Sequence, residues 1–170
     1  QHVFARRSVA GSLVKIDSEL RNNGFFLFVR SGWRHPKVQN LAYFLEAAKN
    51  GIDSANNLYA TPQHIVKNPD ATYPHSTGGV VDFEIWDLKT NTRLPMGEKG
   101  VPIHAWDLEI QEIPENWQEF KKNRRVLYHL FRNEGFYPTG EFWHWGRGDH
   151  LSAVTAIMMG EKDYHPWYHI

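Results

Sequence analysis

The chain has 170 residues, of which 41% are hydrophobic and 14% are aromatic. Lysine plus arginine and aspartate plus glutamate both total 19, and the resulting net charge of zero argues against a nucleic-acid partner or an anionic membrane surface. There is no cysteine, which excludes disulfides, thiolate metal sites and cysteine nucleophiles, so any metal must be held by histidine and carboxylate. This length and composition predict a single domain over residues 1–170 with its own core.

The first part of the chain predicts a helix, a strand and a second helix. Apolar residues recur at helical spacing near the start: Val9, Leu13, Ile16 and Leu20. They predict an amphipathic helix over 4–22 that ends at Asn22-Asn23-Gly24. The apolar run 25–30 predicts a buried strand, and Pro36 is suited to the first turn of a helix over 36–49. Residues 51–74 contain three prolines and predict a long loop, a kind of segment that is usually functional.

The second part of the chain predicts two more strands and two more helices. Polar and apolar residues alternate over 80–86, which predicts a half-buried strand. Residues 95–114 predict another irregular segment, 115–134 a third helix, and 151–159 a short helix. A closing strand or hairpin is predicted from Phe136-Tyr137 and Glu141–Trp145. The order of these elements predicts an α+β fold with a small antiparallel sheet packed against about three helices. The two irregular segments are expected near the functional site, whose candidate residues are described below.

No apolar run approaches the 18 or more residues that span a bilayer, so we expect no membrane insertion. Residues 1–7 lack the apolar segment of a signal peptide. The compartment, bacterial cytoplasm or periplasm, stays open.

Two short segments combine side chains that bind divalent metals. The first runs from His75 through a Gly-Gly pair to Asp82, and the second runs from Glu141 to His144. Two histidines and one carboxylate leave a fourth position open, as in catalytic zinc sites, whereas a structural zinc site has four protein ligands. The glycine pair lets the backbone turn, so that a loop ligand and a strand ligand can converge. A zinc ion in this set keeps a net charge of about +1 and acidifies its water, whose proton Glu141 could pass to a leaving amine.

The spacing of the second segment leaves two interpretations open. Residues three apart on an ideal strand point to opposite faces, so Glu141 and His144 share a site only where the chain bends, which Gly140 permits. The alternative to a metal site is a loop histidine at position 75 and an aromatic core strand with a surface glutamate.

Arg34 lies between the first predicted strand and the second predicted helix, where side chains are often presented to a cleft. An arginine there could stabilise a tetrahedral oxyanion beside a metal. The alternative is a surface arginine stacked on Trp33.

Together these segments resemble the zinc D-Ala-D-Ala dipeptidases of the VanX type, within the D-alanyl-D-alanine metallopeptidases. The His-x-x-Gly-x-Ala-x-Asp motif of that group is matched by His75, Gly78 and Asp82. Its Glu-x-Trp-His-Trp/Tyr motif is matched by Glu141, Trp143, His144 and Trp145. Further similarity to the dipeptidase branch lies in Arg34-His35-Pro36, Pro95-Met96-Gly97 and Gly148-Asp149. The resemblance extends from about residue 6 to residue 160.

The resemblance implies a zinc peptidase with one Zn²⁺ per chain, held by His75, Asp82 and His144. It implies Glu141 as the catalytic base and then acid, and Arg34 as the group that stabilises the tetrahedral intermediate. The residues implied to contact a small peptide substrate are Tyr73, Ser76 and Trp143, the last as a wall of the site.

Three departures from the family pattern concern the substrate. Tyr73 stands where the family has serine, Val80 where it has alanine, and residues 98–102 where the dipeptidases continue with a Phe-Asp segment. The expected activity is hydrolysis of a D-amino-acid dipeptide such as D-Ala-D-Ala, since the two irregular segments can roof the site and favour small substrates. The alternatives are a D,D- or L,D-carboxypeptidase or endopeptidase acting on peptidoglycan stem peptides, and a non-catalytic zinc-binding module. The oligomeric state stays open.

Overall fold

A computed structural model describes residues 2–59, 61–62, 73–97, 117–138, 141–161 and 164. The elements in chain order are α1 (Arg7–Asn22), β1 (Phe25–Ser31), α2 (Pro36–Asn50), α3 (Ile52–Leu58), the 3₁₀ turn η1 (Pro74–Thr77), β2 (Val80–Asp87), α5 (Gln118–Asn133), β3 (Tyr137–Pro138), β4 (His144–Gly146) and α6 (His150–Met158). Within the described residues no helix is both long and apolar enough to cross a membrane. The fold is α+β, as predicted.

The sheet has four strands in the order β1-β2-β4-β3, and every neighbouring pair is antiparallel. One of its two inner strands, β2, shows the predicted alternation of burial. Val81, Phe83 and Ile85 are buried on one face. Asp82 and Glu84, which alternate with them, therefore lie on the opposite face.

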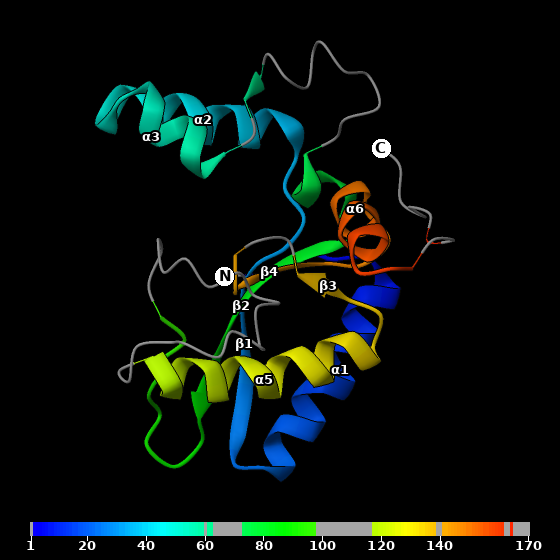
Figure 1. Ribbon diagram of the computed structural model, residues 1–170. Helices are drawn as coiled ribbons and strands as arrows, with labels where there is room; N and C mark the ends of the chain where they lie inside the picture. The colour runs from blue at the N-terminus through cyan, green and yellow to red at the C-terminus, as the bar shows by residue number, and fades with distance from the viewer. Residues whose placement is uncertain are drawn as a thin grey trace.

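Helices α1 and α5 pack against the apolar face of the sheet (Figure 1). The side chains that they contribute to the core are Val9, Leu13, Ile16 and Leu20 from α1, and Leu127 and Phe131 from α5. Phe131 stacks on Phe83 with ring centroids 4.3 Å apart, and it also contacts Phe136 and Trp145. The core therefore occupies one side of the sheet and leaves the Asp82 side available for a site.

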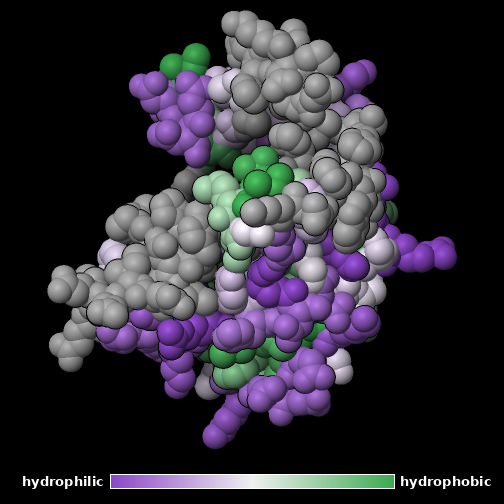
Figure 2. Space-filling view, turned by 45° about the vertical axis from the view of Figure 1, so that its right-hand side comes forward, coloured by the Kyte–Doolittle hydropathy of each residue, from purple (hydrophilic) through white to green (hydrophobic). Residues whose placement is uncertain are grey.

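Helices α2 and α3 form a hairpin beyond the other face of the sheet (Figure 1). Gly51 joins them with φ of 93°, a left-handed conformation that glycine adopts without strain. Two hydrogen bonds connect the two helices, from Tyr43 Oη to Asn56 Oδ1 (2.8 Å) and from Ser54 Oγ to Glu46 Oε1 (2.5 Å). In Figure 2 the visible part of this hairpin is largely hydrophilic.

Three sequence predictions about elements need correction. The loop predicted over 51–74 contains helix α3, because a pair of asparagines does not prevent a short helix that packs on α2. The helix predicted over 4–22 begins at Arg7, because residues 4–6 hydrogen-bond to two loops instead. The strand predicted over 141–145 begins only at His144, after a turn. The irregular segment predicted over 95–114 lies mostly outside the described residues.

Candidate metal centre

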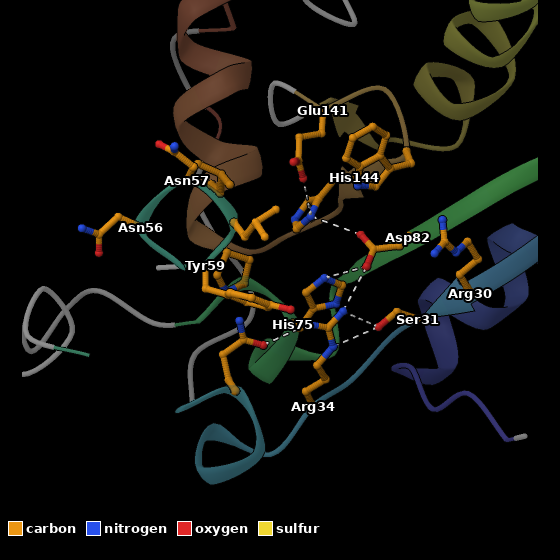
Figure 3. Close-up of a pocket in the computed structure, with 15 residues that line it drawn as sticks. Arg30, Ser31, Arg34, Asn56, Asn57, Tyr59, His75, Asp82, Glu141 and His144 are labelled. Atoms are coloured by element: carbon orange, nitrogen blue, oxygen red, sulfur yellow. Dashed lines mark hydrogen bonds and ion pairs between the residues drawn. The ribbon is translucent and has the colours of Figure 1, made fainter. Parts of the chain in front are cut away.

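Three of the predicted ligands lie together on the open side of the sheet (Figure 3). His75 Nε2 is 3.2 Å from Asp82 Oδ2, and His144 Nδ1 is 3.2 Å from Asp82 Oδ1. One ligand atom from each residue can be chosen so that all three lie within 4.8 Å of one another. The structure thus brings together two residues from adjacent strands and one from a turn.

The register of the sheet explains why two of these residues converge. Asp82 on β2 is paired directly with His144 on β4, and on its other side with Ser31 on β1. Directly opposed residues on antiparallel strands project from the same face, with Cβ atoms about 4.5–5.5 Å apart. A row of three polar side chains therefore crosses three strands, with the aspartate at its centre.

His75 reaches this row from the 3₁₀ turn η1. Pro74 begins the turn, and Gly78 ends it with φ of 71°, so the chain reverses into β2 within a few residues. His75 Nδ1 lies 2.8 Å from the carbonyl oxygen of Gly32. A carbonyl can only accept, so Nδ1 carries the proton and Nε2 presents its lone pair toward Asp82.

The protonation states favoured here are those that a metal ligand needs. Burial lowers the pKa of His75 below its ordinary value, because the surrounding protein disfavours the charged imidazolium. Burial alone would raise the pKa of Asp82, but the polar contacts of its carboxylate with His144 and His75 hold that pKa well below its usual range. Near neutral pH the centre therefore offers an ionised carboxylate and, at position 75, a neutral imidazole.

The donor set fits a small divalent cation. Bonds of 2.0–2.2 Å in a tetrahedral site place neighbouring ligand atoms about 3.3 Å apart. Each histidine nitrogen lies at nearly this distance, 3.2 Å, from a different oxygen of the Asp82 carboxylate. Asp82 Oδ1 is also buried without a hydrogen-bond partner, a costly state that a bound cation would relieve.

Arg34 lies directly beside the three candidate ligands. Its Nη2 donates to Asp82 Oδ2 at 3.1 Å and to Ser31 Oγ at 2.8 Å, and its Nη1 donates to Gln39 Oε1 at 3.1 Å. The guanidinium is thus held by groups from β1, β2 and α2. Sequence reasoning missed Ser31 and Gln39, although a glutamine on the first turn of a helix, five positions after a candidate arginine, is a usable signal.

Glu141 lies at the edge of the centre. Its Oε2 is 3.9 Å from His144 Nδ1, and its side chain is 39% exposed. The backbone N–H of His144 donates to the carbonyl of Glu141 at 3.1 Å, which closes a turn just before β4. The bend that the spacing required is therefore confirmed, while Gly140 itself lies outside the described residues.

The three predicted substrate contacts have different surroundings. Trp143 lines the cavity in front of the centre. Ser76 is buried and donates to the backbone oxygen of Arg34 at 2.8 Å, and Tyr73 is buried and donates to Asn40 Oδ1. Neither Tyr73 nor Ser76 belongs to the described lining of this cavity, so their contact with substrate stays a prediction.

The cavity has a volume of about 910 Å³ and extends from the candidate metal ligands to helix α3. Its wall on the far side from Asp82 includes Asn56, Asn57 and Tyr59, as Figure 3 shows. Sequence reasoning missed these residues because no motif marks them and their segment was assigned to a loop. Arg30 on β1 adds a cationic group to the lining.

No family model and no curated protein matches this sequence. Among solved structures the fold is similar to that of the LdcB LD-carboxypeptidase, which recognises peptidoglycan, at 17% identity and a TM-score of 0.53. It is similar to vancomycin-resistance D,D-dipeptidase VanXYg, solved with a D-Ala-D-Ala phosphinate analogue, at 17% identity and a TM-score of 0.55. It is also similar to DacB from Streptococcus pneumoniae D39, at 16% identity and a TM-score of 0.50.

These similarities cover 95%, 96% and 95% of this chain, in that order, but only 65%, 57% and 74% of the other chains. The chain therefore spans less than two thirds of the length of the first two. At 16–17% identity the comparisons establish the fold alone.

Proposed function

We propose that this protein is a zinc-dependent peptidase that hydrolyses a short peptide containing D-amino acids, such as D-Ala-D-Ala. The observation that carries the proposal is the convergence of His75, Asp82 and His144, with an arginine and a glutamate beside them, at the wall of one cavity. The fold supports it, because proteins named as a D,D-dipeptidase and an LD-carboxypeptidase share that fold.

His75, Asp82 and His144 would hold one Zn²⁺ and leave a further coordination position open. When bound, the ion would supply a Lewis acid that polarises a peptide carbonyl and lowers the pKa of water. The carbonyl of Gly32 would fix the tautomer of His75 through Nδ1, which is a common way of orienting an imidazole ligand.

Glu141 is placed to move the proton. It is partly exposed to the cavity and lies within 4 Å of His144, so that it flanks the ligands without joining the closely spaced group of three. We assign it the removal of a proton from the attacking water and the return of that proton to the leaving amine. Both transfers need a carboxylate within hydrogen-bond reach of the reacting atoms, and the assignment is supported by the turn before β4, which brings Glu141 to the edge of the candidate ligands.

Arg34 is placed to stabilise negative charge on the carbonyl oxygen as water adds. Its donors are aimed by Ser31 and Gln39 before any substrate arrives, so little reorganisation is needed during the reaction. Its bond to Asp82 keeps the guanidinium beside the metal ligands.

A second candidate is a carboxypeptidase that removes a terminal residue from a longer stem peptide. The cavity of about 910 Å³ favours it, since pockets of roughly 300–1,000 Å³ hold drug-sized ligands and this one is near the upper end. Its extension to α3 gives room for residues beyond a dipeptide.

The test combines metal analysis with two substrates. Purified protein is assayed for zinc and for amino acid release from D-Ala-D-Ala and from a pentapeptide that ends in D-Ala-D-Ala, with and without a chelator. We expect about one zinc per chain and chelator-sensitive hydrolysis of the dipeptide. Hydrolysis of the pentapeptide alone would select the carboxypeptidase, zinc without hydrolysis of either would indicate a binding module, and no bound metal would overturn the ligand assignment. His144→Ala serves as the metal-deficient control.

A further inference from the structure

Residues 4–6, here called the strap, precede α1 and hydrogen-bond to the two loops that carry Arg34 and His75. The backbone N–H of Trp33 donates to the carbonyl of Phe4 at 2.6 Å. The N–H of Arg6 donates to the carbonyl of Gly78 at 3.0 Å, and its Nε donates to the carbonyl of Thr77 at 2.6 Å. The strap therefore ties the loop that carries Arg34 to the turn that carries His75.

One peptide group links the strap to a metal ligand. The carbonyl of Gly32 accepts from His75 Nδ1 at 2.8 Å, and the N–H of the same peptide unit, on Trp33, donates to Phe4 at 2.6 Å. Hydrogen bonds at both ends of a peptide group fix its orientation and polarise each other. The strap is thus hydrogen-bonded directly to the peptide group that orients the His75 ring.

The close approach of the strap depends on two glycines. A Cβ atom at Gly32 would lie 2.3 Å from the carbonyl oxygen of Phe4 and 2.9 Å from a side-chain carbon of Val3. A Cβ atom at Gly78, which has φ of 71°, would lie 3.2 Å from Cγ of Arg6. Any side chain at position 32 would therefore push the strap away from the loop.

We propose that the strap is a positioning element of the metal centre. Through the backbone of Phe4 and the guanidinium of Arg6, it holds the Gly32–Trp33 peptide and the 75–78 turn, and so keeps His75 oriented for metal binding. This inference rests on the proposed function. It goes beyond it by assigning metal retention to a segment that contributes no ligand.

Two variants break the strap in different ways. Gly32→Ala places a methyl group against the Phe4 carbonyl, and Arg6→Ala removes the donor to Thr77. Partners of ligating histidines typically contribute 10–100-fold to metal affinity, so we expect metal release about ten times faster or more. The measurement is the rate of transfer of zinc from the loaded protein to a chromogenic chelator, with the visible spectrum of the cobalt-loaded protein as a second readout.

Two control variants keep the strap in place. Gly11→Ala adds a methyl group where nothing lies within 4 Å, and Phe4→Ala removes a side chain that is 65% exposed but leaves its backbone carbonyl. Both should release metal at the parent rate. Thermal unfolding of each metal-free variant separates a change at the centre from a general loss of folding, and Arg6→Ala keeps the test available if Gly32→Ala does not fold.

The outcomes separate the two proposals. A parent protein that retains no metal would overturn the proposed function, and the strap inference with it. A parent that retains metal, with Gly32→Ala and Arg6→Ala releasing it at the parent rate, would overturn the strap inference alone.

Discussion

Under the proposed function, replacement of Glu141 should separate metal binding from turnover. Glu141 flanks His144 but is not one of the three closely grouped ligands, so Glu141→Gln should leave the zinc content unchanged. Loss of a positioned general acid–base group reduces rates by about 10²–10⁴-fold, and we expect a fall in kcat of at least this size. Metal analysis and kcat are measured on the same preparation. Retained turnover in a zinc-loaded variant would contradict the assigned role.

Arg34 allows a sharper test, because a lysine keeps the charge and loses the forked geometry. Arg34→Lys cannot donate at once to Ser31, Gln39 and Asp82 as the guanidinium does. Removal of one oxyanion donor typically lowers kcat by about 10²–10³-fold, so the effect should appear in kcat more than in KM.

The matched control is Arg30→Lys, which changes another arginine of the same cavity. Arg30 forms an ion pair with Glu84, away from the candidate ligands. This variant should leave kcat within a few-fold of the parent. An equal fall in both variants would indicate that loss of a guanidinium group anywhere in the cavity lowers kcat, and would contradict a specific role for Arg34.

The grouping of the three candidate ligands could be predicted from the sequence, whereas the residues that support the site could not. His75, Asp82 and His144 stand in short motifs whose chemistry is visible in the residue types alone. Ser31 and Gln39 act through contacts between distant segments, which only the sheet register and the start of α2 bring about.

At the scale of elements, the residue pattern predicted those helices and strands whose structure depends on residues close together in the sequence. Helix α1 has the four buried residues expected from its spacing, and β2 has the expected alternation. Helix α3 was missed because its seven residues are too few to show a period, and its stability comes from packing on α2. The start of α1 was misplaced because residues 4–6 bond to loops that are distant in the sequence.

The end of α6 provides a pH-dependent prediction. Hydrogen bonds from the Tyr137 hydroxyl and then from Arg132 hold the pKa of Glu161 below its ordinary value of 4.5. Such a group stabilises the fold fully above the unfolded pKa, and this contribution is lost as the pH falls through the lower, folded pKa. Because Glu161 is partly exposed, the contribution should be under about 1 kcal/mol.

Glu161→Gln should therefore lower the free energy of unfolding near pH 7, and the difference from the parent should shrink toward pH 3. Urea unfolding at several pH values measures it. A difference that stays constant across this range would contradict an ionic role for Glu161.

At the scale of the whole molecule, the residues that form the core and the residues of the candidate site lie on opposite faces of the sheet. Its core face is filled by Phe83 and Trp145 against Phe131, and its other face carries Asp82 and His144. The site residues are thus fixed by packing in which they take no part.

Phe131→Ala tests this dependence. The side chain is fully buried and touches three other aromatic rings, so its truncation should cost about 3–5 kcal/mol of unfolding free energy. Val14→Ala on α1, where the side chain is 70% exposed, should change stability by less than about 0.5 kcal/mol. Chemical denaturation measures both, and a small effect at Phe131 would contradict the position of the core.

The two faces of β4 determine where this chain can change in length. His144 and Trp145 are neighbours on a three-residue strand and face opposite sides, so inserting or deleting one residue there would exchange an imidazole for an indole on each side. The turn after β2 lies at the end of β2 that is distant from the site. In this turn the Asp87 carboxylate accepts from the N–H groups of Lys89 and Thr90. Insertions in that turn would not change which residues of β4 face the core and which face the site. Lineages of this protein should therefore vary in length around residues 88–92 and keep a constant length over 141–146.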